Sequence, residues 1–152
     1  MLEIKQQAIK YLSYREYGAD ELCLKLNSRF INTIVIRDAI EQLQLEGLQS
    51  DLRFSESYIQ SRVNRGYGRY YIENMLKLKG IAKDDIKRAF DECEIDWSEV
   101  IYRVWQKKFS DCFPNNASEK SKQTRFLLSR GFSSQQIIDV FKGLLDETYI
   151  AS

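Results

Sequence analysis

Residues 65–90, RGYGRYYIENMLKLKGIAKDDIKRAF, decide the fold, because residues 15–40, REYGADELCLKLNSRFINTIVIRDAI, match them at a shift of 50 positions. The shift places the first arginine of each stretch on that of the other, and it places the pair Tyr17-Gly18 on Tyr67-Gly68. The apolar positions between these landmarks and the end of each stretch also correspond. Self-similarity at this period is typical of proteins built from repeated supersecondary units.

A third copy follows the second at a shift of 51, and it matches best in its last half. The matched positions of the third copy are Leu127, Gly131, Phe132, Ile137 and Phe141. The match is weaker before Leu127, where residues 110–118 form an irregular stretch that contains Pro114. We therefore predict three repeats, at residues 1–50, 51–96 and 97–152, stacked through contacts between neighbours.

Each copy shows the apolar spacing of amphipathic helices. Ile36, Ala39, Ile40 and Leu43, for example, recur at i, i+3, i+4 and i+7. Gly47 followed by Leu48 predicts a Schellman helix end, and Ser133 with Gln136 predicts a capping box. The fold class we predict is all-α, with three tandem three-helix repeats forming an elongated, curved array. The nine expected helices cover residues 2–16, 19–28, 33–46, 51–64, 69–79, 83–93, 97–109, 119–130 and 134–147.

The composition argues against several classes of protein. The 152 residues include no histidine, which removes the commonest general base and the commonest transition-metal ligand. The three cysteines, Cys23, Cys93 and Cys112, form no Cys-x-x-Cys motif. No apolar run approaches the roughly 18 residues that a membrane helix needs. We expect a cytoplasmic protein that is not an enzyme, with no cofactor, no metal and no membrane contact.

Positive charge is local rather than general. The net charge is only +1, and residues 1–50 carry six basic and seven acidic side chains. Residues 58–88 carry eight basic and three acidic side chains, and residues 103–130 carry seven and two. Such segments suit an acidic partner or phosphate groups.

The most unusual segment is residues 62–71, RVNRGYGRYY, which combines three arginines and three tyrosines around a glycine-flanked turn. Arginine and tyrosine are enriched in interfaces, so the segment is a candidate contact surface. Alternatively, its tyrosines pack inside the array and its arginines are solvated. It is no phosphate loop, because it lacks the Gly-x-x-x-x-Gly-Lys spacing.

A second basic cluster lies within residues 120–130, for which a solvated helix face is the alternative interpretation. The segment of residues 91–96 is acidic and is expected to be a solvated helix end. The predicted partner-binding residues are Arg62, Arg65, Tyr67, Arg69, Tyr70, Lys77, Lys79, Lys122, Arg125 and Arg130.

Three groups of residues resemble motifs of the RecX family, in the same order and at a similar chain length. They are Leu12-Ser13-x-Arg15 with Glu21-Leu22-x-x-Lys25-Leu26; Asp51-x-x-Phe54-x-x-x-Tyr58-x-x-x-Arg62-x-x-x-Gly66-x-Gly68 with Lys79-Gly80-Ile81; and Arg125-Phe126-Leu127-Leu128-x-Arg130-Gly131-Phe132. Gly18-Ala19 is a departure, because many members carry serine at the start of that helix. Glycine also caps helices.

The resemblance implies a negative regulator of the RecA recombinase, which lies in the groove of the RecA filament on single-stranded DNA. It implies inhibition of strand exchange, ATP hydrolysis and co-protease activity, and it transfers no active-site residues. We expect a monomer that binds the filament, with possible direct contact to DNA. The rival interpretation is a helical protein that binds DNA directly and acts without RecA.

Overall fold

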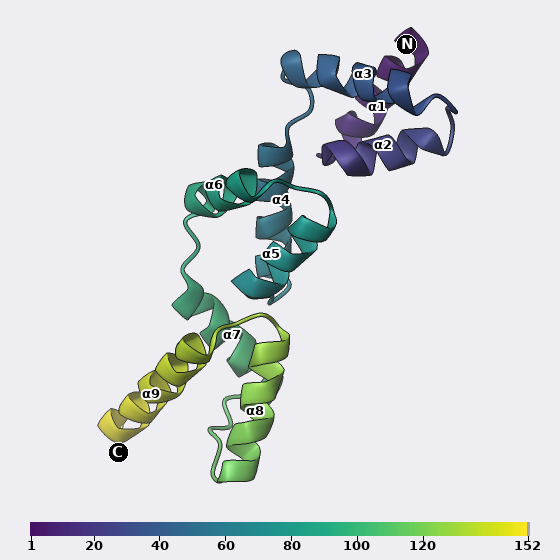
Figure 1. Cartoon of the computed structure of the whole chain (residues 1–152). Helices are drawn as coiled ribbons and strands as arrows, with labels where there is room; N and C mark the ends of the chain where they lie inside the picture. Colours follow the sequence, from purple (N-terminus) through teal and green to yellow (C-terminus); the bar gives the residue numbers. More distant parts are fainter. Residues whose placement is uncertain (152) are drawn as a thin grey trace. The chain divides into compact units, whose positions relative to one another are not determined.

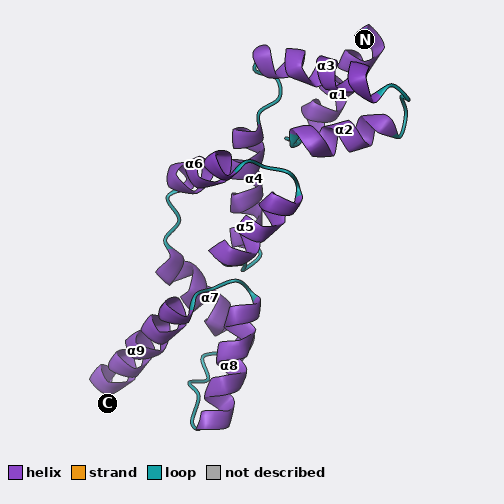
Figure 2. Ribbon diagram, viewed as in Figure 1, coloured by secondary structure: helices purple, strands orange, loops and turns teal. Residues whose placement is uncertain are grey.

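The computed structural model describes residues 1–151, with side chains up to residue 146, and this part of the chain holds nine helices and no strand (Figures 1 and 2). The helices are α1 (Leu2–Tyr14), α2 (Ala19–Asn27), α3 (Thr33–Leu45), α4 (Asp51–Asn64), α5 (Arg69–Leu78), α6 (Lys83–Cys93), α7 (Trp97–Phe109), α8 (Ala117–Ser129) and α9 (Ser134–Ala151). The predicted all-α class and the nine predicted helices are confirmed, and α9 extends beyond its predicted end at residue 147. None of the described helices is long and apolar enough to cross a membrane.

The predicted helix ends are formed by backbone hydrogen bonds. After α3, Leu48 N donates to Leu43 O at 2.8 Å and Gly47 N donates to Gln44 O at 3.0 Å, which is the Schellman arrangement. Before α9, Ser133 N donates to Gln136 Oε1 at 2.8 Å. Gln136 N donates in return to Ser133 Oγ at 3.1 Å, so the predicted capping box is confirmed.

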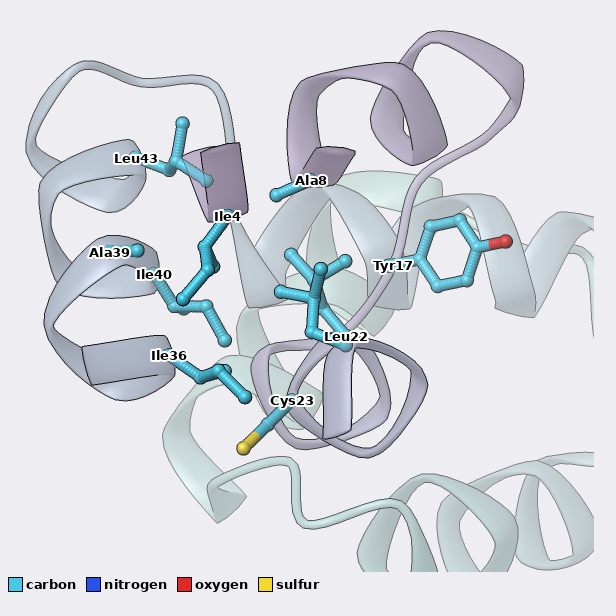
Figure 3. Packing of buried hydrophobic residues seen from close by; sticks show 10 residues of the cluster. Ile4, Ala8, Tyr17, Leu22, Cys23, Ile36, Ala39, Ile40 and Leu43 are labelled. Atoms are coloured by element: carbon cyan, nitrogen blue, oxygen red, sulfur yellow. The ribbon is translucent and has the colours of Figure 1, made fainter. Parts of the chain in front are cut away.

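The first three helices enclose their own apolar core. Figure 3 shows the side chains of Ile4, Leu22 and Ile36 converging from α1, α2 and α3. Leu22 and Ile36 are completely buried, as the helical spacing predicts for one apolar face of each helix. Burying a leucine or isoleucine side chain contributes roughly 1.5–3 kcal/mol, so this core outweighs the weak propensity of such short helices.

By packing, the chain forms two units, one of Met1–Ile59 with Met75–Cys93 and the other of Gln60–Asn74 with the residues from Glu94 onward. Both α4 and α5 therefore contribute residues to each unit. These two units are defined by contacts within the structure, whereas the three predicted repeats are defined by sequence similarity. The division into three repeats, at residues 1–50, 51–96 and 97–152, stays a prediction.

The second unit is centred on α7, which packs against α8 and α9. Its buried side chains include Ile101, Trp105 and Leu127. A buried polar pair joins α7 to α8, because Trp105 Nε1 donates to Gln123 Oε1 at 2.8 Å. Gln123 Nε2 donates in turn to Cys112 O at 2.9 Å, which ties the irregular stretch before α8 to that helix.

We expect Gln123→Ala to lower the free energy of unfolding by about 2 kcal/mol, because the buried indole N–H of Trp105 would lose its acceptor. Urea denaturation followed by circular dichroism measures the change. The control is Gln106→Ala, whose exposed amide lies 3.4 Å from Asp111 Oδ2 and which should change stability by less than about 0.5 kcal/mol. Equal losses of unfolding free energy in the two variants would contradict the conclusion that the buried hydrogen bond from Trp105 to Gln123 stabilises the second unit.

Candidate functional site

The arginine- and tyrosine-rich segment folds around the end of α4. Gly66 has φ +88°, and Tyr67 N donates to Arg62 O at 3.0 Å, so α4 ends in the same manner as α3. Gly68 follows directly and is buried before α5 begins. The turn therefore fixes the backbone of the whole candidate segment.

The turn is bound to the connection between α8 and α9, which is distant in sequence. Gly68 N donates to Arg130 O at 2.7 Å, and Tyr70 N donates to Gly131 O at 3.1 Å. These bonds place Arg130 beside Tyr67. Two of the predicted clusters therefore meet, which the sequence pattern alone did not predict.

Arg130 is held between aromatic rings. Its guanidinium carbon lies 4.7 Å from the centre of the Tyr67 ring and 5.3 Å from that of Phe126. Tyr67 is itself stacked on Tyr71, with ring centres 4.1 Å apart. Cation–π contacts of this kind hold a charged group in place without neutralising it. Arg130 is thus a preordered cation.

In the first repeat, the arginine that corresponds to Arg65 forms an ion pair with a carboxylate. Arg15, which corresponds to Arg65, donates to both carboxylate oxygens of Glu21 at 3.1 and 3.0 Å. These hydrogen bonds raise the pKa of the Arg15 guanidinium above its ordinary value. The residue that corresponds to Glu21 in the second repeat is Tyr71, so Arg65 lacks this carboxylate and is exposed. The arginine at this position therefore forms an ion pair with Glu21 in the first repeat, whereas in the second repeat it adds positive charge to the surface.

Arg65 and Arg130 line one cavity of about 350 Å³ together with three further cations, Arg103, Lys107 and Lys108 of α7. These three belong to the basic segment of residues 103–130 but are not among the predicted partner-binding residues. The buried residues of α7, such as Trp105, face the core of the second unit. The available signal was their spacing of four and five residues, which places them near one face of α7.

The remaining predicted residues are distributed over both units. Arg69 Nε donates to Glu73 Oε1 at 2.8 Å, so its charge is already paired, and Tyr70 is 57% exposed. Lys79 lies 3.7 Å from Glu21 Oε2 in the first unit. The other predicted cations comprise the partly buried Arg62 and the exposed Lys77, Lys122 and Arg125. Their role in partner binding stays a prediction.

Among the described residues, no group of three or more cysteine, aspartate or glutamate side chains is arranged to hold a metal ion. The cavity that contains Arg65 and Arg130 is lined by cations, apolar side chains and one amide. This arrangement suits the binding of an acidic group through charge-assisted hydrogen bonds.

Comparisons with known proteins give a consistent result. Residues 50–89 match the second three-helix domain of RecX, and residues 94–141 match the third. The "Regulatory protein RecX" of Pseudomonas fluorescens is 38% identical, over 94% of this chain and 92% of its own length. That of Legionella pneumophila is 40% identical, over 93% of this chain and 95% of its own length.

The crystal structure of RecX from Lactobacillus salivarius has the same fold, with a TM-score of 0.75 and 23% identity. The superposition covers 93% of this chain and 94% of that one. A second crystal structure, of a regulatory protein RecX, also gives a TM-score of 0.75, at 20% identity, over 91% of this chain and 70% of that one. Sequence identity across nearly the whole length, with the motifs at Arg62 to Gly68 and Arg125 to Phe132, establishes that the chain belongs to the RecX family.

Proposed function

We propose that this chain binds the RecA–DNA filament and negatively modulates the recombinase, ATPase and co-protease activities of RecA. The observation that carries the proposal is the membership of the RecX family, whose named relatives are regulatory proteins. The family resemblance links this regulation to RecA, and the action is by binding rather than by catalysis.

The charge distribution supports a binding role for the second and third repeats. Arg65 and Arg130 lie on one cavity, and Arg130 is preordered by Tyr67 and Phe126. Preordered cations lose less conformational entropy on binding than free ones do, so they favour recognition of acidic surfaces. A RecA filament on DNA offers both carboxylate and phosphate groups to such a surface.

The test is the ATPase rate of RecA on single-stranded DNA as a function of the concentration of this chain. We expect the rate to fall by more than half at saturation, because a protein bound along the filament hinders the rearrangements between protomers that accompany hydrolysis. A DNA-dependent ATPase of unrelated fold on the same DNA is the control, and it should keep its full rate. Equal inhibition of the two enzymes would instead favour masking of DNA without recognition of RecA.

A further inference from the structure

A groove in the second unit is formed by α8, α9 and the irregular stretch before α8. Its lining comprises residues 113–116, Lys120 and Thr124 of α8, and part of α9. Its volume is about 600 Å³, within the range of roughly 300–1,000 Å³ for ligand-binding pockets. It shares no lining residue with the cavity that contains Arg65 and Arg130. This α8–α9 groove is therefore a separate surface.

The groove exposes an apolar stripe of α9 that the core of the unit does not use. Ile137 and Phe141 are buried, whereas Ile138 and Leu145 are 46% and 56% exposed. Ile138 and Leu145 are seven residues apart, which places them about 10 Å apart along one face of the helix. Single exposed apolar side chains are ordinary on a protein surface, but these two line a concavity. An apolar concave lining is typical of a binding site.

The wall opposite this stripe is held at both of its ends. Gln123, which is 1% exposed, donates to Cys112 O at 2.9 Å, and Asn116 Oδ1 accepts a hydrogen bond of 2.9 Å from a backbone N–H in the first turn of α8. Between these ends, Phe113 packs edge-on against Phe141, with ring centres 6.4 Å apart. A wall that is already ordered loses little conformational entropy when a ligand binds.

The charge of the lining indicates the chemistry of the ligand. Lys120 and Lys142 line the groove, and no carboxylate does. Both lysines are exposed, and within the part of the chain that the structure describes neither forms an ion pair. Glu119 in the first turn of α8 offsets the positive end of that helix, so the two lysines are the source of positive charge. A ligand that carries carboxylates beside an apolar group is complementary to this lining.

The length and the rings of the groove favour a peptide over a nucleic acid. The apolar stripe extends over two helical turns, which is longer than a single side chain. Bases of a single strand bind by stacking on exposed aromatic faces. The two rings of the lining, Phe113 and Phe141, pack against each other, and Phe141 is buried.

We infer that the α8–α9 groove binds a short acidic segment of a partner protein. One bulky apolar side chain of the segment lies on Ile138 and Leu145, and its carboxylates pair with Lys120 and Lys142. The inference concerns the isolated chain and depends neither on RecA nor on the surface around Arg130.

The test begins with a phage-displayed library of random dodecapeptides that is selected on the full chain. We expect the enriched peptides to carry a bulky apolar residue beside at least two aspartates or glutamates. A fluorescein-labelled peptide of the enriched sequence then gives the dissociation constant by fluorescence anisotropy. Enrichment of basic peptides, or of apolar peptides without carboxylates, would overturn the inference, and so would the absence of any enrichment.

The apolar contact is tested with Ile138→Ala combined with Leu145→Ala. The matched control is Ile34→Ala with Leu45→Ala, which removes the same residue types from positions of α3 that are 75% and 88% exposed. Alanine favours helix, and circular dichroism confirms that both variants are folded. We expect the dissociation constant of the peptide to rise about tenfold in the groove variant, because several buried methyl and methylene groups are lost, and less than about twofold in the control.

The ion pairs are tested with Lys120→Gln combined with Lys142→Gln. The control is Lys10→Gln with Lys87→Gln, which removes the same charge from exposed positions of the first unit. We expect about fivefold weaker binding at low salt and a shallower dependence on salt in the groove variant, with little change in the control. If the groove variants bind the peptide as tightly as the unaltered chain, the peptide binds elsewhere and the inference is overturned.

A membrane surface is the other partner that an apolar stripe with lysines can contact. Cosedimentation with phosphatidylglycerol vesicles tests it, and we expect no binding that depends on the groove. Vesicle binding that both groove variants lose and both controls keep would overturn the peptide assignment. None of these assays contains RecA, so a failure of the proposed inhibition of RecA leaves their results unchanged.

Discussion

Gly131→Ala is expected to lower the free energy of unfolding by about 3–5 kcal/mol, because it combines backbone strain with a steric clash. Gly131 has φ +99°, and a Cβ atom placed there would lie 2.5 Å from Tyr71 N. The backbone would have to move, which would break the bonds from Gly68 N to Arg130 O and from Tyr70 N to Gly131 O. Urea denaturation measures the loss.

Two further glycines separate the two causes. Gly47→Ala adds strain alone, since φ is +74° and a Cβ atom there meets nothing within 4 Å, and it should cost about 1–2 kcal/mol. Gly68→Ala adds the clash without left-handed strain, because its Cβ atom would lie 2.5 Å from the carbonyl carbon of Gly131. If Gly131→Ala costs no more than Gly47→Ala, the contact between the two turns does not stabilise the fold.

Local features of the fold were predictable because they depend on nearby residues. The apolar spacing of Ile36 to Leu43 and the glycine after α3 each determine a helix or its end without reference to the rest of the chain. The irregular stretch of residues 110–118 was recognised, but its attachment was not. That attachment depends on the buried amide of Gln123, which donates a hydrogen bond to the backbone oxygen of Cys112. Because every residue has a backbone oxygen, the sequence does not indicate which one accepts this bond.

The candidate site was predictable only in part, for a similar reason. The composition of residues 62–71 identified Arg65 and Tyr67, and the basic cluster of α8 identified Arg130. Their proximity depends on backbone hydrogen bonds between two glycine turns, which carry no distinctive side chains. Lys107 and Lys108 are not among the predicted residues, because charged positions on an exposed helix face carry no signal that distinguishes a binding site from a solvated surface.

Reversal of three exposed charges, Arg65→Glu, Lys122→Glu and Arg125→Glu, is expected to weaken inhibition of the RecA ATPase by roughly a hundredfold in concentration. Each reversal replaces attraction by repulsion and is worth about 1 kcal/mol at an exposed site. These positions are preferable to Arg62 and Arg69, because Arg62 is partly buried and Arg69 is paired with Glu73. Reversal at Arg62 would place a carboxylate in a partly buried position, and reversal at Arg69 would place one beside Glu73, so neither change tests a lost contact with RecA alone.

The matched control is Lys10→Glu, Arg29→Glu and Arg37→Glu, which changes the net charge by the same amount on exposed positions of the first repeat. Arg37 pairs with Asp20 at 3.3 Å, but both side chains are at least half exposed, so little stability is lost there. Because both triple variants repel a polyanion equally at long range, only local contacts distinguish them. Equal loss of inhibition in the two folded variants would show that net charge, rather than this surface, governs binding. Full inhibition by both would leave apolar contacts as the source of affinity.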